Sequence, residues 1–236
     1  MNRKRNYLTI GLLVVFSVLT INAYSQIANV NQVGGQPIMM KKYEKVEGSP
    51  YIGSGKWFPG KFFVRDGNTI NGVMVRYNAY DDNLEFQREG KSPLIIDSKI
   101  LDGFEFGMIP EGSDKTVSYN FKKGDLIGSN DLKADGFYRI IYEGEFKIYQ
   151  KLKVNQISVT PPDYGQSAYD KFVQSEDYFF IDGDGNLDDF KLNRGNFYSK
   201  FQAKKKDIKA YLKKKSVDFD DATDVAQLSA YIESLL

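Results

Sequence analysis

The sequence predicts a mainly β protein of the α+β class, in which an antiparallel curved sheet or partly closed barrel is followed by a small C-terminal helical unit. Between residues 61 and 154, runs rich in β-branched and aromatic residues alternate with turns of Gly, Pro, Asp and Ser, which indicates about seven to nine strands. The 236 residues include 16 Tyr and 17 Phe, and such bulky rings suit the faces of a sheet. From residue 196 onward, apolar residues recur at helical spacing instead.

Residues 1–25 have the three parts of a signal peptide. A basic cluster at residues 3–5 precedes an apolar run over residues 8–21, and small residues follow at Ala23 and Ser25. We expect cleavage after Ser25 and therefore an exported mature chain. The alternative is an uncleaved anchor, because the apolar run approaches the roughly 17 residues that a spanning helix needs.

The composition limits both cross-links and partners. The chain has no Cys, so it forms no disulfide and carries no lipid-modified cysteine. Its formal charge is +1, and loss of the three leader cations changes this to −2. A nearly neutral exported protein has no electrostatic basis for binding nucleic acid, and we expect none as a partner.

Residues 26–47 are expected to form a flexible N-terminal arm or an edge element, because they are polar, contain glycine and show no sustained period. The antiparallel β domain is assigned to residues 48–160. Its first part, residues 48–60, is dense in Gly and Pro, which predicts turns.

The centre of the β domain is predicted at residues 73–86, where two strand-like runs flank the polar turn residues 81–83. Short polar side chains hydrogen-bond their own backbone and favour a tight reversal. The pattern predicts a three-stranded meander over residues 61–65, 69–79 and 84–88. Because side chains alternate along a strand, one face of the middle strand should be buried, namely Val73, Val75, Tyr77 and Ala79.

The remaining elements follow in order along the chain. Residues 161–176 begin with Pro, Asp and Gly and are assigned as a linker. Residues 177–236 are assigned a final strand plus C-terminal helices, with a break near Ala203 and an N-terminal cap at Asp221. Within the last predicted strand of the β domain, Gln150 is the one polar residue on the apolar side. The other strands of the domain are predicted at residues 94–96, 104–106, 117–121, 137–142 and 146–154.

Two segments carry a family resemblance. They are Gly48-Ser49-Pro50-Tyr51 and residues 76–86, which read RYNAYDDNLEF, and a Lys-rich helix and an acidic-capped helix follow them. In this order the chain resembles a group of uncharacterised exported proteins of Bacteroidota with a signal peptide, a β-rich body and a helical tail. The resemblance implies a Gram-negative envelope location, in the periplasm, at the outer membrane or outside the cell. It implies no activity and no catalytic residue.

The absence of His and Cys excludes Ser-His-Asp and Cys-His catalysis and the zinc or iron sites built from those ligands. Carboxylate chemistry remains, and Asp81, Asp82 and Glu85 are the candidates for it. A glycan hydrolase needs two carboxylates that face each other across a cleft. The favoured interpretation is a solvated hairpin tip, because turn formation alone explains Asp residues there.

Two loops have residue types found in ligand sites. The stretch from Asp182 to Asp188 alternates oxygen-bearing side chains with glycine, as calcium loops do, but it departs from that pattern at Leu187 and Asn193. A turn without metal is therefore favoured. The stretch Gly53-Ser54-Gly55-Lys56 lacks the spacing of a phosphate-binding loop and is interpreted as a plain turn.

Two groups of side chains are candidates for binding surfaces. Eight lysines between residues 200 and 215 could contact anionic lipid headgroups, although such a run is more typical of the solvated face of an amphipathic helix. Four aromatic residues could line a shallow groove for sugars or peptide, or could fill the core: Tyr51, Trp57, Tyr77 and Tyr80.

Together these observations favour a non-catalytic binding or structural module of the cell envelope that recognises a protein or a surface polymer. No catalytic residue, metal or cofactor is assigned. A carboxylate-dependent glycan hydrolase and a small-ligand carrier with a pocket in the β body are the two alternatives.

Overall fold

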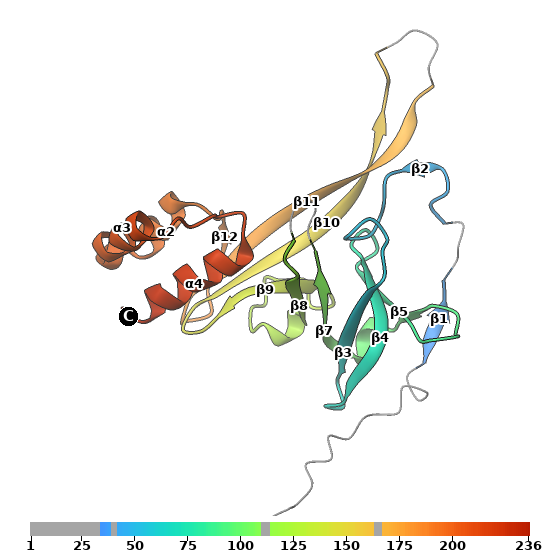
Figure 1. Ribbon diagram of the computed structural model, residues 1–236, viewed down its shortest axis with the longest axis horizontal. Coiled ribbons are helices and arrows are strands. Elements are labelled where there is room, and N and C mark those ends of the chain that lie inside the picture. Colours follow the sequence, from blue (N-terminus) through green and yellow to red (C-terminus); the bar gives the residue numbers. More distant parts are fainter. Residues whose placement is uncertain (1–33, 39–41, 110–113, 163–166) are drawn as a thin grey trace, which may run out of the picture.

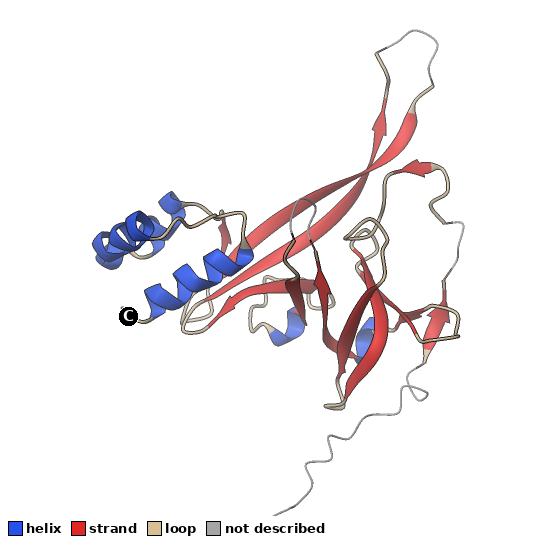
Figure 2. Cartoon of the chain, viewed as in Figure 1, coloured by secondary structure: helices blue, strands red, loops and turns tan. Residues whose placement is uncertain are grey.

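The computed structural model describes residues 34–38, 42–109, 114–162 and 167–236, so the predicted signal peptide lies outside the described residues. The described chain is mainly β with short C-terminal helices (Figure 2), which confirms the predicted fold class. Twelve strands form one sheet in the order β1-β6-β5-β4-β3-β7-β8-β9-β10-β11-β12, and β2 pairs with β11. The sheet is curved and does not close into a barrel (Figure 1).

The described strands exceed the predicted number because three short ones, β1, β2 and β12, have too few residues to show a pattern. The strands are β1 (Gly35–Pro37), β2 (Val46–Glu47), β3 (Phe58–Val64), β4 (Thr69–Asn78), β5 (Asn83–Gln87), β6 (Leu94–Ile96), β7 (Leu101–Met108), β8 (Val117–Lys123), β9 (Phe137–Glu143), β10 (Lys147–Val159), β11 (Tyr169–Ile181) and β12 (Leu187–Phe190). The helices are η2 (Ser98–Ile100), η3 (Gly124–Leu126), α2 (Arg194–Lys200), η4 (Gln202–Lys204), α3 (Lys205–Lys214) and α4 (Ala222–Glu233).

The predicted meander is present as β3, β4 and β5, which pair antiparallel in sequence order. All four residues predicted for the inner face of β4 are buried. They face an interior filled with aromatic rings from β7, β8 and β9. Phe104 stacks on Phe121 with ring centroids 4.5 Å apart, and Phe137 meets Phe104 edge-on at 5.2 Å. The concave side of the curved sheet is therefore a packed core.

The described part of the predicted N-terminal arm lies along the sheet. β1 pairs antiparallel with β6, and β2 pairs in parallel with β11. Between them the ring of Tyr43 packs edge-on against Phe172 of β11, with centroids 5.5 Å apart. Exposed strand edges have unpaired N–H and C=O groups, and β1 and β2 pair with such edges.

The longest of the described strands, β10 and β11, pair over 13 residues each as a hairpin that projects beyond the rest of the sheet (Figure 1). The linker predicted over residues 161–176 is therefore wrong from Tyr169 onward, because β11 begins there. Pro161 and Pro162 follow the end of β10, where a residue without an N–H ends strand pairing. A hairpin tip and a domain linker share the same residue types, so local composition did not separate them.

The C-terminal helices pack on the other end of β9 to β12 and form a second core with Ile148 and Phe180. The first helical segment breaks over η4, which contains Ala203, as predicted. The side chain of Asp221 accepts a hydrogen bond from the Thr223 amide at 2.7 Å, so the predicted cap of α4 is also confirmed. Near its other end, α4 is held to the sheet by Glu233, which accepts hydrogen bonds from the Tyr142 hydroxyl and the Glu145 amide.

Candidate functional site: a groove beside the long hairpin

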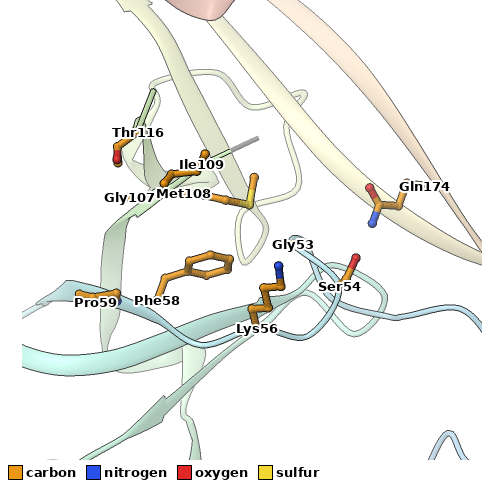
Figure 3. Close-up of a pocket in the computed structure, with 10 residues that line it drawn as sticks. All are labelled: Gly53, Ser54, Lys56, Phe58, Pro59, Gly107, Met108, Ile109, Thr116 and Gln174. Carbon is orange, nitrogen blue, oxygen red and sulfur yellow. The ribbon is translucent and has the colours of Figure 1, made fainter. Parts of the chain in front are cut away.

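A surface groove with a volume of 920 Å³ lies between the start of β3, the end of β7 and the hairpin strand β11 (Figure 3). We call it the hairpin groove. Six of its residues are exposed and four are half-buried, so it opens to solvent. Its lining is Gly53, Ser54, Lys56, Phe58, Pro59, Gly107, Met108, Ile109, Thr116 and Gln174.

The shape of the groove depends on Gly53. This residue has φ +72°, which favours glycine, and a Cβ atom built on it would lie 2.6 Å from Phe58 Cζ and 2.9 Å from Met108 Sδ. A glycine therefore lets the turn before β3 approach the apolar floor closely. The turn predicted for Gly53-Ser54-Gly55-Lys56 is present, and it forms one wall of the groove.

A second hollow of 340 Å³ continues the groove toward the start of α4, because both are lined by Gly53, Met108 and Gln174. We call it the Arg139 pocket. Its other lining residues come from the β body, from β8 to β11, from the segments before α4 and from the first residue of α4: Ile52, Tyr119, Arg139, Gln150, Leu152, Glu176, Tyr178, Leu192, Asp220 and Ala222.

Arg139 is 7% exposed, and among the residues that the structure describes it has no ion-pair partner. Its Nη1 donates to Gln150 Oε1 at 3.1 Å, and its Nη2 donates to the Ser118 carbonyl at 3.4 Å. Its Nε is buried and has no hydrogen-bond acceptor within the described part of the chain. The guanidinium carbon lies 3.7 Å from the centroid of the Tyr119 ring, and burial lowers the pKa of Arg139.

Gln150 connects Arg139 to the hairpin. Its Nε2 donates to Glu176 Oε2 at 2.6 Å and to the Tyr178 hydroxyl at 2.8 Å, and that hydroxyl donates to Glu176 Oε1 at 3.0 Å. The pKa of Tyr178 is raised, mainly by burial and to a smaller extent by the charge of Glu176. The pocket thus has a buried guanidinium on one side and an exposed carboxylate, already engaged by two neighbours, on the other.

The candidate carboxylate Glu85 is sealed in a structural cluster. It is 2% exposed, and its oxygens accept from Arg76 Nε at 2.6 Å and from the Tyr51 hydroxyl at 3.0 Å. The Arg76 guanidinium lies 4.1 Å from the Tyr51 ring centroid and 4.4 Å from that of Trp57. The two segments that carry the family resemblance therefore contact each other here, and their contact has a structural role.

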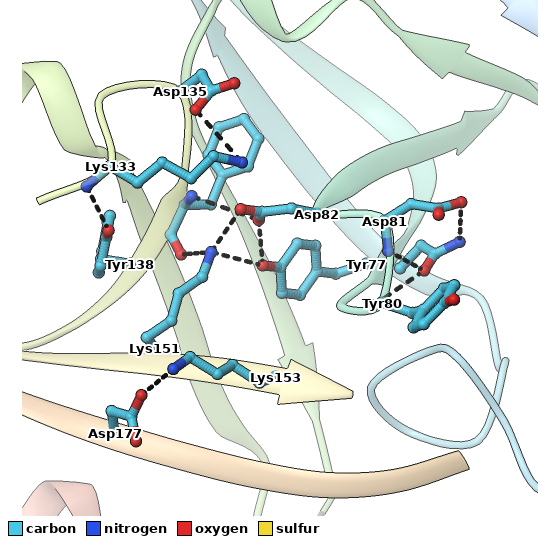
Figure 4. Close-up of polar contacts among 12 residues, drawn as sticks. Tyr77, Tyr80, Asp81, Asp82, Lys133, Asp135, Tyr138, Lys151, Lys153 and Asp177 are labelled. Atoms are coloured by element: carbon cyan, nitrogen blue, oxygen red, sulfur yellow. Dashed lines mark hydrogen bonds and ion pairs between the residues drawn. The ribbon is translucent and has the colours of Figure 1, made fainter. Parts of the chain in front are cut away.

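The sequence predicts a solvated hairpin tip at Asp82, but most of this side chain is covered by other residues. Figure 4 shows that it points toward Lys151 of β10, whose Nζ lies 2.6 Å from Asp82 Oδ2. The Tyr77 hydroxyl donates to Asp82 Oδ1 at 2.5 Å, and the Phe137 carbonyl accepts from Lys151 Nζ at 2.9 Å. The hairpin strand comes from 69 residues further along the chain, so no local pattern could indicate this burial.

The three candidate carboxylates do not oppose one another across a cleft. Asp82 pairs with Lys151 and Glu85 pairs with Arg76, whereas Asp81 pairs with Lys42 at 2.5 Å. Neither the hairpin groove nor the Arg139 pocket is lined by any of the three.

The four candidate aromatic residues do not form a shared groove either. Tyr77 is fully buried, Tyr51 and Trp57 flank a guanidinium, and Tyr80 is 40% exposed beside Phe172, with ring centroids 5.1 Å apart. Core packing accounts for Tyr77, and cation–π packing accounts for Tyr51 and Trp57. Only Tyr80 of this set offers its ring to solvent to a substantial extent.

The stretch from Asp182 to Asp188 closes on itself as a turn between β11 and β12. Asp182 Oδ1 accepts from the amides of Asp184 and Asn186, and its Oδ2 accepts from Asn186 Nδ2. These bonds lower the pKa of Asp182, and the bond from the Asn186 side chain makes the largest contribution. Over the described ranges, no group of three or more acidic side chains is placed to hold a metal ion.

The Lys-rich stretch covers η4 and α3. Ile208 is its buried contact with the helical core, whereas most of the lysines are exposed, as expected for an amphipathic helix. Lys200 pairs with Asp188, and Lys204 donates to the Leu235 carbonyl. Every helix in the described chain is too short or too polar to cross a bilayer.

Sequence reasoning missed Arg139, Gln174 and Met108 as site residues. Arg139 interrupts an otherwise apolar run, Phe-Tyr-Arg-Ile-Ile-Tyr, and Gln150 interrupts the apolar side of the next strand. These two residues pair directly across β9 and β10, so two polar intrusions on neighbouring strands were the available signal.

Comparison with known proteins adds no relative. No family model, no curated protein and no solved structure matches the chain. The resemblance to exported proteins of Bacteroidota therefore stays a prediction.

Proposed function

We propose that the protein is an exported, non-catalytic binding module of the cell envelope, and that it recognises a protein or a surface polymer through the hairpin groove. The observation that carries this proposal is an open groove beside a packed aromatic core. An extended chain can lie along a surface groove, whereas a filled interior leaves little space for a ligand.

The site also fits a binding role chemically. The floor of the groove is apolar at Phe58, Pro59, Met108 and Ile109, and the adjoining pocket supplies polar groups at one end. Binding sites typically combine an apolar surface with a small number of polar groups, which fix the orientation of the ligand. The acidic residues proposed for hydrolysis, Asp81, Asp82 and Glu85, are engaged with cations elsewhere.

A small-ligand carrier is the second candidate. The volume of the groove, 920 Å³, and its apolar floor are of the size and character that suit a small apolar ligand. This alternative is less favoured because six of the lining residues are exposed, so the groove would leave much of such a ligand in contact with water.

The test compares two exposed apolar side chains, one inside and one outside the groove. Ile109 is 58% exposed and lines the groove, whereas Leu126 is 42% exposed and lies in η3, outside the lining. The tagged chain, expressed with its leader, is recovered from the envelope fraction with its bound partner. Ile109→Glu should lose the partner, because it places a charge at the apolar floor, and Leu126→Glu should retain it.

Equal capture by Ile109→Glu, Leu126→Glu and the wild type would contradict the proposed use of the groove. Recovery of the tagged chain from the cytosol with an intact leader would contradict export. Circular dichroism of both variants controls for folding, and both sites are exposed enough to tolerate the change.

A further inference from the structure

Arg139 is an incompletely satisfied cation that lines a pocket. It is 7% exposed, and in the described chain no carboxylate forms an ion pair with it. Burial of a charge is unfavourable unless the charge is paired and hydrogen-bonded. Its protein partners are two neutral oxygens and the face of Tyr119.

One edge of the guanidinium carries an unsatisfied donor and a weakly satisfied one. Nε has no acceptor, and Nη2 has one long contact, 3.4 Å to the Ser118 carbonyl. Two parallel N–H groups on the edge of a guanidinium match the two oxygens of a carboxylate. Glu176, a carboxylate of the pocket lining, is held by Gln150 and Tyr178 and forms no ion pair with Arg139.

We infer that the Arg139 pocket binds the terminal carboxylate of an extended peptide, whose preceding apolar residues lie in the hairpin groove. The two hollows share Gly53, Met108 and Gln174, so one ligand can occupy both. This inference rests on the proposed function and specifies the chemistry of its partner.

The acidic residues of the pocket favour a peptide over a fatty acid. Glu176 and Asp220 are exposed acceptors in the lining. A peptide carries N–H donors next to its carboxylate and can use these acceptors. Glu176 and Asp220 repel the carboxylate of either ligand, but a fatty acid has no N–H donor with which to offset that repulsion.

The experiment measures binding by calorimetry with three probes. The first is an acetylated pentapeptide that ends in two leucines with a free carboxylate, the second is the same peptide with a terminal amide, and the third is dodecanoate. The wild type should bind the free acid about tenfold or more tightly than the amide, because a charge-assisted bond to Arg139 is lost with the amide. This comparison uses the wild type alone, so it does not depend on any variant folding.

Variants assign the effect to Arg139. Arg139→Met should weaken binding of the free acid by about tenfold or more and remove the preference for it over the amide. Arg65→Met is the matched control, since Arg65 is exposed, pairs with Asp102 and Asp125, and lies outside both linings. It should bind as the wild type does.

Three results would overturn the inference: equal binding of the acid and the amide, unchanged binding by a folded Arg139→Met, or no binding of the acid at millimolar concentration. Arg139-dependent binding of dodecanoate without the peptide would overturn the peptide as ligand and favour the carrier. If Ile109→Glu loses the envelope partner but acid and amide bind alike, the proposed function stands and the carboxylate inference fails.

Discussion

Lys151 and Arg139 lie on neighbouring strands and are buried to nearly the same extent, at 9% and 7% exposure, but their surroundings differ. Lys151 faces Asp82 at 2.6 Å, and Arg139 faces neutral oxygens. Each also lies over an aromatic ring, Tyr138 and Tyr119 respectively. The difference is therefore an anion in direct contact: Lys151 has one, whereas Glu176 and Asp221 act on Arg139 without forming an ion pair with it.

This difference separates a structural charge from a charge available to a ligand. The Asp82–Lys151 pair joins the turn between β4 and β5 to the long hairpin, so it fixes two distant parts of the sheet. Arg139 makes no comparable connection through an anion. The comparison predicts that the two cations respond very differently to substitution.

The largest effect is expected from Asp82→Asn. It leaves Lys151 buried without its anion, and we expect a loss of about 3 kcal/mol in the free energy of unfolding. This value is at the low end of the range for broken buried ion pairs, because both side chains keep some solvent contact. Asn tolerates the φ of +58° at this position, so backbone strain does not confound the result. Urea denaturation measures the change.

The control is Asp177→Asn, which breaks the ion pair with Lys153 on the same strand as Lys151 (Figure 4). Both partners are nearly half exposed, with side-chain exposures of 44% and 47%. An exposed pair contributes little, so a loss of about 0.5 kcal/mol or less is expected. If the two Asp→Asn variants lost equal stability, burial of the Asp82–Lys151 pair would not be the cause.

A smaller effect is expected from pH, through Tyr77. Burial, followed by the charge of Asp82, raises the pKa of Tyr77 well above its usual range near 10. Above that pH the unfolded tyrosine releases its proton while the folded one retains it, so the unfolded state binds fewer protons and stability falls as pH rises. The loss from Tyr77 is about 1.4 kcal/mol for each pH unit above 10, until its folded pKa is reached.

Urea denaturation above about pH 10 should show that the free energy of unfolding falls less steeply with pH in Tyr77→Phe than in the wild type. Tyr80→Phe is the control, because its ring is 40% exposed. The lowered pKa of Lys151, caused by burial, acts in the opposite direction: the unfolded lysine binds more protons up to its usual 10.5, so this group raises stability as pH rises to that value. Parallel curves for Tyr77→Phe and the wild type would refute the assignment.

The sequence predicted features that depend on neighbouring residues. The inner face of β4, the break near Ala203 and the cap at Asp221 follow from alternation, spacing and a single side-chain acceptor, and all three are present. The burial of Asp82 and the Arg139 pocket could not be predicted in the same way. Lys151 is 69 residues from Asp82, and the pocket draws on β8 to β11 together, so both depend on how the sheet curves.

A small effect is also expected from Arg139→Met, and this variant tests the comparison most directly. The variant loses two hydrogen bonds to neutral oxygens, each worth about 1 kcal/mol, but it also removes a buried charge that no described anion contacts directly. These contributions oppose each other, so the free energy of unfolding should change by less than about 1 kcal/mol in urea denaturation. A loss as large as that of Asp82→Asn would mean that Arg139 is a structural residue, because a side chain required for folding cannot be replaced without cost even when no ligand is present.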